Sequence, residues 1–308
     1  SGVGSTSPSY AIDGVDPTMT ITSGTVSSGS TTNDATIALV FTSSESTSNL
    51  IEGDITLSGG TLSDFAGSGT GYTATFTPSA DGATSIAIGA DKFTDAAGNQ
   101  NEASNTFAWT YDSTQLTITI ASSTSGVTSG STTSNANIAL TFSTSESTTG
   151  FESGDVTVSG GTLSDFAGSG DAYTATFTPS GDAAYTISVA AGVFADSAGN
   201  TNIVSNTFAW TYDGTGPSTT ITSSESGVAT GSTFTVTITF GESVANFVVG
   251  DISMSGASVS LSGSGTTYTA TITPSADGAV TVDVAGGVAN DAYGNVNTVA
   301  TQFSIESD

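Results

Sequence analysis

The sequence predicts an all-β protein made of three tandem antiparallel β-sandwich domains in an extended array. Three observations support this prediction. Apolar residues alternate with small polar ones at every second position, the alternating runs are short, and clusters of Gly, Ser, Asp or Asn bound them. The clearest runs start at Ile37 ("IALVFT"), Tyr72 ("YTATFTP") and Phe107 ("FAWTYD"). Runs spaced by about 8 to 12 residues, roughly seven in each hundred, are typical of two packed sheets.

The sequence contains three copies of the same repeat unit. "YTATFTP" begins at Tyr72 and Tyr173 and becomes "YTATITP" at Tyr268, in steps of 101 and 95 residues, and "SGGTLSDFAGSG" occurs unchanged at Ser58 and Ser159. An aspartate follows or precedes each unit at an equivalent position: Asp13, Asp112, Asp213 and Asp308. These residues predict domains 13–112, 113–213 and 214–308, each close to the usual size of a domain.

Residues 1–12 look like the end of a further unit. Within them "SPSYAID" aligns with "FAWTYD", the last predicted strand of the first unit. We expect either the terminal strand of a preceding repeat in a longer array or a strand donated to a neighbouring subunit. The array is favoured, because the third unit has its own last strand, "QFSIESD" from Gln302.

The charge of the chain excludes several classes of function. There are 28 acidic residues against a single basic one, Lys92, and neither His nor Cys occurs, so the formal net charge is −27. Imidazole or thiolate catalysis and metal sites with nitrogen or sulfur ligands are therefore excluded. The chain has no basic surface for nucleic acid. No apolar run reaches the roughly 20 residues of a membrane span, so we expect no direct membrane insertion.

Acidic residues recur at positions that a seven-stranded sandwich brings to one end. The loops after the second and sixth strands return to the end where the first strand begins, beside the entering linker. Calcium takes about 6 to 8 oxygen ligands, so the sequence predicts calcium sites at the seams between domains. The candidate ligands are Asp13, Asp16, Glu45, Asp54 and Asp95 at the first domain, Asp112, Glu146, Asp155 and Asp196 at the next seam, and Asp213, Glu242, Asp251 and Asp291 at the last.

Simple turn chemistry is the alternative for each of these carboxylates. The motif "DAAGNQN" at Asp95 recurs as "DSAGNTN" and "DAYGNVN", and an Asp side chain before Gly-Asn readily binds its own backbone. A turn role is equally consistent with Asp54, Asp155 and Asp251, which precede strands. It is favoured for Asp81, Asp182 and Asp277, whose contribution to the following seam is the lesser alternative.

Four motifs recur in fixed order in all three units. They are "F-x(1,3)-E-S" from Phe41, Phe142 and Phe240, "GD-[IV]", "Y-T-A-T-x-T-P" and "D-x-x-G-N". This combination resembles the tandem bacterial immunoglobulin-like repeats of very large surface adhesins. The resemblance implies immunoglobulin-like sandwiches in an extracellular, cell-surface stalk, often stiffened by calcium, that holds a binding domain away from a cell. The third unit departs most, since it lacks the acidic residue equivalent to Asp64 and Asp165 and is two residues shorter before Glu242.

We therefore expect a structural spacer of an extracellular adhesin or surface fibre, without enzymatic activity. Its expected partners are neighbouring repeats of the same chain or fibre. Two alternatives stay open: a filament subunit assembled by strand donation with other copies of the chain, and a module that binds carbohydrate or a partner protein. A sugar platform of Phe107, Trp109 and Tyr111 is less favoured than core packing, because the third unit keeps the same alternation with Phe303 and Ile305. A glycosidase is disfavoured, because its paired carboxylates would recur three times.

Overall fold

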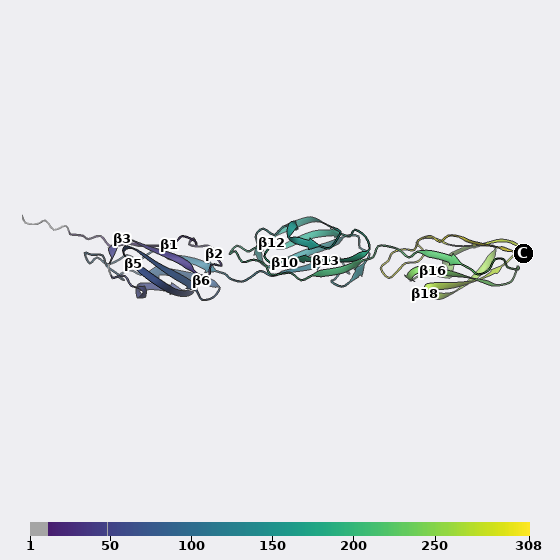
Figure 1. The fold of residues 1–308 in the computed structure, drawn as a ribbon, viewed down its shortest axis with the longest axis horizontal. Helices are drawn as coiled ribbons and strands as arrows, with labels where there is room; N and C mark the ends of the chain where they lie inside the picture. Colours follow the sequence, from purple (N-terminus) through teal and green to yellow (C-terminus); the bar gives the residue numbers. More distant parts are fainter. Residues whose placement is uncertain (1–11, 48) are drawn as a thin grey trace, which may run out of the picture.

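The computed structural model describes residues 12–47 and 49–308. Three β units follow one another in a row, with the first unit and the C-terminus at opposite ends of the array (Figure 1). The all-β prediction is confirmed, and each unit consists of two small sheets. The terminal strand expected for residues 1–12 lies outside the described residues, apart from Ile12.

The first repeat places a three-stranded sheet, β1-β3-β5, beside a four-stranded sheet, β2-β7-β6-β4. All pairings are antiparallel except that of β2 with β7, which is parallel. Its elements are β1 (Met19–Ser23), β2 (Thr31–Thr32), β3 (Ile37–Thr47), the 3-10 turn η1 (Glu52–Asp54), β4 (Ile55–Ser58), β5 (Gly60–Pro78), β6 (Gly82–Ile88) and β7 (Phe107–Tyr111).

The second repeat has the same topology, with sheets β12-β10-β8 and β11-β13-β14-β9. Its elements are β8 (Ile118–Ser122), β9 (Thr132–Thr133), β10 (Ile138–Thr148), η2 (Ser153–Asp155), β11 (Val156–Val158), β12 (Thr162–Thr178), β13 (Ala183–Val189) and β14 (Phe208–Tyr212).

The third repeat consists of two three-stranded sheets, β15-β16-β18 and β17-β19-β20. Within the described residues it forms no short strand equivalent to β2 or β9. Its elements are β15 (Thr219–Thr222), β16 (Phe234–Val244), η3 (Val249–Asp251), β17 (Ile252–Ser255), β18 (Ala257–Pro274), β19 (Gly278–Val284) and β20 (Phe303–Ser307).

The alternation of apolar and polar residues determines which side of each strand faces the core. Along β3, Ile37, Leu39 and Phe41 are buried while the residues between them are exposed. Phe41 pairs with Tyr72 on β5 and with Ile21 on β1, so one face of this sheet is continuously apolar. Such a face must be covered by a second sheet, and the face of the opposite sheet in each repeat supplies the cover.

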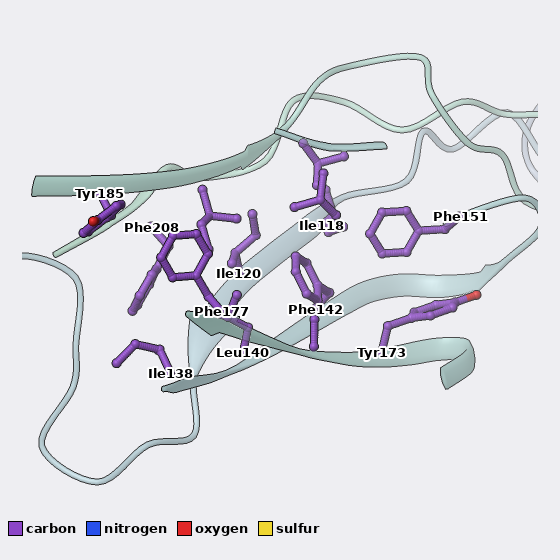
Figure 2. Close-up of a cluster of buried hydrophobic side chains, with 14 of the residues drawn as sticks. Ile118, Ile120, Ile138, Leu140, Phe142, Phe151, Tyr173, Phe177, Tyr185 and Phe208 are labelled. Carbon is purple, nitrogen blue, oxygen red and sulfur yellow. The ribbon is translucent and has the colours of Figure 1, made fainter. Parts of the chain in front are cut away.

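Each repeat has a hydrophobic core of its own. The three clusters of buried side chains run from Met19 to Trp109, from Leu116 to Trp210 and from Phe234 to Ile305. In the second repeat the apolar side chains fill the space between the strands, with Tyr185 and Phe208 toward one end and Phe151 and Tyr173 toward the other (Figure 2).

The Trp residues expected in the core are there. Trp109 and Trp210 are only 3% and 2% exposed, and the Trp210 ring centroid lies 4.9 Å from that of Phe177 in an edge-to-face contact. The preference for core packing over a sugar platform is therefore confirmed for these side chains.

The long strand β5 folds back on itself. An added Cβ at Gly60 would lie 2.4 Å from the carbonyl oxygen of Thr77 and 2.5 Å from the Phe76 ring, so the two arms of β5 run side by side at a separation that only glycine permits. The same crowding recurs at Gly161, immediately before β12. The close approach of the two arms thus explains the second glycine of "SGGTLSDFAGSG" in the first two repeats.

Candidate metal sites at the repeat seams

Three groups of three carboxylates lie where the repeats meet and at the N-terminal end of the first repeat. In each group an oxygen of every side chain lies within 4.8 Å of the others. We call them the entry group (Asp13, Glu45, Asp95), the first seam group (Asp112, Glu146, Asp196) and the second seam group (Asp213, Glu242, Asp291). All of their members were expected from the sequence, and the structure brings them together in the expected combinations.

A shift in strand register accompanies the glutamate of each group. The pairing of β10 with β12 shifts register between Ser143 and Thr148, and Glu146 lies in this interval. Glu45 and Glu242 lie in the corresponding shifts of β3 and β16. Glu146 is half-buried and follows the inward alternation of Ile138, Leu140 and Phe142. The glutamate therefore occupies an inward-facing position just beyond the end of the core.

A tight turn in the β13–β14 connection holds the buried aspartate. Oδ1 of Asp196 accepts hydrogen bonds from the backbone N–H groups of Ala198, Gly199 and Asn200, at 2.7 to 2.9 Å. Oδ2 accepts one from the Asn200 side chain at 2.9 Å. Asp95 and Asp291 are bound in the same way by Asn99 and Asn295. Turn chemistry and membership of a carboxylate group therefore occur together at the same residue.

The third member of each seam group follows the last strand of the preceding repeat. The N–H of Asp112 donates to Thr32 O and that of Asp213 to Thr133 O, both at 3.0 Å, which ties each aspartate to the repeat that it ends. Glu146 and Asp196 belong to the following repeat. Each seam group therefore draws its carboxylates from both sides of a seam.

The clustered charges act on the glutamates. Burial raises the pKa of Glu146 above its ordinary value, and the negative charges of Asp112 and Asp196 raise it further. The pKa of Glu45 and that of Glu242 are raised by burial and then by their own group members. With one basic side chain in 308 residues, at most one group can have a basic partner. The repulsion is therefore largely uncompensated by protein groups.

The aspartates respond differently, because N–H donors surround them. The hydrogen bond from the Asn99 side chain lowers the pKa of Asp95, with the backbone N–H groups of the turn adding to it. For Asp291, burial raises the pKa, but the bonds from Asn295 and the turn backbone outweigh burial and leave the pKa lowered. These aspartates are held ionised, in a form able to bind a cation.

Four predicted ligands lie outside the three groups. Asp54, Asp155 and Asp251 end the turns η1, η2 and η3, where each carboxylate accepts the backbone N–H three residues earlier, at 2.8 to 3.0 Å. For them the structure shows the turn role. Asp16 is exposed and lies close enough to raise the pKa of Glu45, but it is not a member of the entry group.

Two aspartates that we expected to be turn residues bind the linkers. Oδ1 of Asp81 accepts from the backbone N–H and the hydroxyl of Ser113, at 2.9 and 2.7 Å, and Oδ2 accepts from the Thr114 hydroxyl at 2.6 Å. Asp182 accepts the backbone N–H of Gly214 at 2.7 Å. The bonds from Thr114 and Ser113 lower the pKa of Asp81. The hydrogen bond from the Thr215 side chain lowers the pKa of Asp182, and the N–H of Gly214 lowers it further.

A buried asparagine that the sequence did not lead us to expect lies in the same loop as the aspartate turn. Asn202 is 1% exposed; its Oδ1 accepts from the backbone N–H groups of Val193 and Phe194, and its Nδ2 donates to two carbonyls. Asn101 and Asn297 make the equivalent bonds. The signal was present, since the second Asn of "D-x-x-G-N-x-N" occurs in all three units.

A family model described as a bacterial Ig-like domain matches residues 13–111, 112–212 and 213–306. The chain belongs to the bacterial Ig-like domain family. The three Ig-like repeats thus account for nearly the whole chain, as the motif resemblance implied. No curated protein matches the sequence. None of the helices in the described residues is long and apolar enough to cross a membrane.

Solved structures that match the chain include invasin, described as a bacterial integrin-binding protein, at 14% identity and a TM-score of 0.37. The match covers 96% of this chain and 60% of the invasin chain. The titin tandem I9–I11 matches at 10% identity over 96% of this chain and 98% of its own, with a TM-score of 0.26. The Yersinia pseudotuberculosis adhesin InvE matches at 13% identity over 64% and 58%, with a TM-score of 0.24. Such low TM-scores say nothing about function.

Proposed function

We propose that this chain is a structural spacer of an extracellular adhesin or surface fibre, in which calcium at the seams stiffens an array of bacterial Ig-like repeats. The observation that carries the proposal is the composition of the two seam groups. Asp112 is bonded to the first repeat, whereas Glu146 and Asp196 belong to the second. An ion bound by all three is satisfied in only one relative orientation of the two repeats.

The donor set suits calcium. Each group offers carboxylate oxygens alone, and hard cations such as Ca²⁺ prefer oxygen ligands, with main-chain carbonyls and water completing the shell. Like charges at such short separations repel, and a divalent cation would remove that repulsion. Extracellular modules bind calcium with dissociation constants on the order of 10⁻⁴ to 10⁻³ M, which fits a site that is filled outside a cell.

The spacer role follows from the arrangement of the repeats. They lie end to end, each with its own core, so each repeat adds length (Figure 1). The partners that we propose are accordingly the neighbouring repeats of the same chain or fibre, with no chemical reaction catalysed. A cell-surface location fits the family and the calcium requirement.

Small-angle scattering of the full chain tests the proposal. With calcium the pair-distance distribution should be that of a narrow rod, and with a chelator it should broaden while the far-UV circular dichroism stays unchanged. Glu146→Gln should loosen the first seam selectively at saturating calcium. Glu152→Gln is the matched control, because Glu152 is exposed, immediately precedes η2 and belongs to no group. Identical scattering with and without calcium would overturn the proposal.

A further inference from the structure

Protein atoms other than the grouped carboxylates also join the repeats directly. The backbone N–H of Asn33 donates to the carbonyl of Ala198 in the second repeat, at 3.1 Å. At the second seam the hydroxyl of Ser134 donates to the carbonyl of Tyr293, at 2.7 Å. Asn33 follows β2 and Ser134 follows β9, and each acceptor lies two residues after the buried aspartate of its turn. The same loop of one repeat therefore contacts the same turn of the next.

The contact at the first seam is close. An added Cβ at Gly199 would lie 3.3 Å from Oδ1 of Asn33, and the φ angle of Gly199 is +99°. Glycine is the residue that allows both this backbone conformation and the approach of the preceding repeat.

A second contact fixes the linker on the preceding repeat. Asp81 binds Ser113 and Thr114, and Asp182 binds Gly214. Ser113 and Gly214 each lie 32 residues after the aspartate that binds them, so the two contacts are equivalent. We call Asn33 with Asp81, and Ser134 with Asp182, the docking faces of the first and second repeats. Each face therefore contacts both the linker and the next repeat. Two separate contacts restrict rotation of one repeat relative to the next more than a single contact does.

The third repeat lacks this face. Six residues separate Ser30 from Ile37 and Ser131 from Ile138, but only Thr233 separates Ser232 from Phe234. The loop that carries Asn33 or Ser134 in the other repeats is therefore missing.

The aspartate of the third repeat equivalent to Asp81 has a different partner. Asp277 accepts the hydroxyl of Thr230, at 2.6 Å, within its own repeat. The backbone of Asp308 is bonded to Val228 and Thr230 of the same repeat. This end of the third repeat is thus closed by its own residues.

We propose that the docking faces of the first two repeats are binding surfaces for the aspartate turn of a following repeat, and that they set the orientation between repeats without a metal ion. The third repeat presents no such surface, so a domain joined to it would be held without this contact. The proposal does not rest on calcium, because every contact is between protein atoms.

Distance measurements across each seam of the full chain test the proposal. The protein has no cysteine, so introduced cysteine pairs accept spin labels at two sites only. The exposed positions Ala38, Ala139 and Thr235 are equivalent in the three sandwiches. The pair at 38 and 139 reports on the first seam, and the pair at 139 and 235 on the second. All measurements are made in a chelator.

Asp81→Ala should broaden the distance distribution of the first pair and leave that of the second pair unchanged. Asp182→Ala and Ser134→Ala should do the reverse. Asp277→Ala is the matched control and should change neither. Removal of residues 132–136 makes the second repeat resemble the third and should also broaden the second pair. If that deletion unfolds the repeat, Ser134→Ala tests the same contact without altering the backbone.

Distributions for Asp81→Ala and Ser134→Ala equal to those of the wild type would overturn the proposal, as would a change caused by Asp277→Ala. Repeating the series in saturating calcium separates this proposal from the previous one. If calcium has no role, adding it leaves the wild-type distance distributions unchanged, which contradicts the proposed calcium stiffening. The differences among the variants in chelator would still support the docking faces.

Discussion

The side chain of Asn200 donates a 2.9 Å hydrogen bond to the main-chain oxygen of Asp112, although the two residues are 88 positions apart. The same side chain binds Oδ2 of Asp196. Asn295 repeats this arrangement with Asp213 and Asp291 at the second seam. One amide thus connects the linker to the turn that holds a candidate metal ligand, so the geometry of each seam group is partly formed by protein bonds alone.

Calcium titration of Glu146→Gln should show the loss of one site. The wild type should bind three ions per chain, one for each carboxylate group, and the variant two. Replacing a charged ligand should weaken the altered site at least about tenfold, which corresponds to about 1.4 kcal/mol. Isothermal titration calorimetry measures this, with Glu306→Gln, an exposed change on β20, as the control. Equal stoichiometry and affinity in the wild type and the Glu146→Gln variant would contradict the assignment.

The stability of the metal-free protein should depend on pH through the three glutamates. Their pKa values are raised in the folded state, so they bind protons more tightly folded than unfolded. The resulting stabilisation is fully present below the pKa of the unfolded glutamate, about 4.3, and is lost as pH rises through the folded-state pKa. Moving from neutral pH toward about pH 5 should therefore bring part of it back.

A variant with Gln at positions 45, 146 and 242 isolates this effect. Asp95 and Asp81 act in the opposite direction, because their lowered pKa values give stability that is lost as pH falls through the folded-state pKa. They are present in both proteins, so the difference between the variant and the wild type reports on the glutamates. Urea unfolding in a chelator at several pH values measures it. Parallel pH profiles for the two proteins would contradict the prediction.

Trypsin should cut the chain at one place and more slowly in calcium. Lys92 is the single basic residue and lies in the β6–β7 connection, three residues before Asp95 of the entry group. Cleavage requires local opening of this loop, and an ion bound to Asp95 should hold the loop closed. Gel analysis of the two fragments gives the rate. Asn101→Ala should accelerate cutting with and without calcium, because Asn101 binds the N–H of Lys92.

Asn202→Ala should destabilise the second repeat more than any exposed substitution. The change leaves the Val193 and Phe194 N–H groups and two carbonyls without the Asn202 side chain, which is only 1% exposed, as their partner. Leaving a buried polar group without a partner costs about 1–3 kcal/mol, and several are affected here. In a Trp109→Phe background, Trp210 fluorescence reports on this repeat alone, because the third repeat has no Trp. An unfolding midpoint equal to that of the Ser169→Ala control would refute the role.

The sequence determined the features that depend on local pattern. Alternation of apolar and polar residues specifies which face of a strand is buried, as in "IALVFT" from Ile37, and this held in all three repeats. Equivalent carboxylates recur at matching positions, and the end of a sandwich to which a loop returns follows from strand order. The grouping of Asp112 with Glu146 and Asp196 could therefore be predicted without coordinates.

Only the tertiary structure showed that Glu45 belongs to a carboxylate group and Asp54 does not. It also showed which of the expected turn aspartates bind a linker. Asp54 accepts the N–H of Ile51, whereas Glu45 lies in a register shift of β3 and belongs to the entry group. The sequence pattern does not predict that shift. The contact between Ser134 and Tyr293 joins residues 159 positions apart. Hydrogen bonds between loops of different repeats depend on how two folded domains are oriented, and no periodicity within a single strand carries that information.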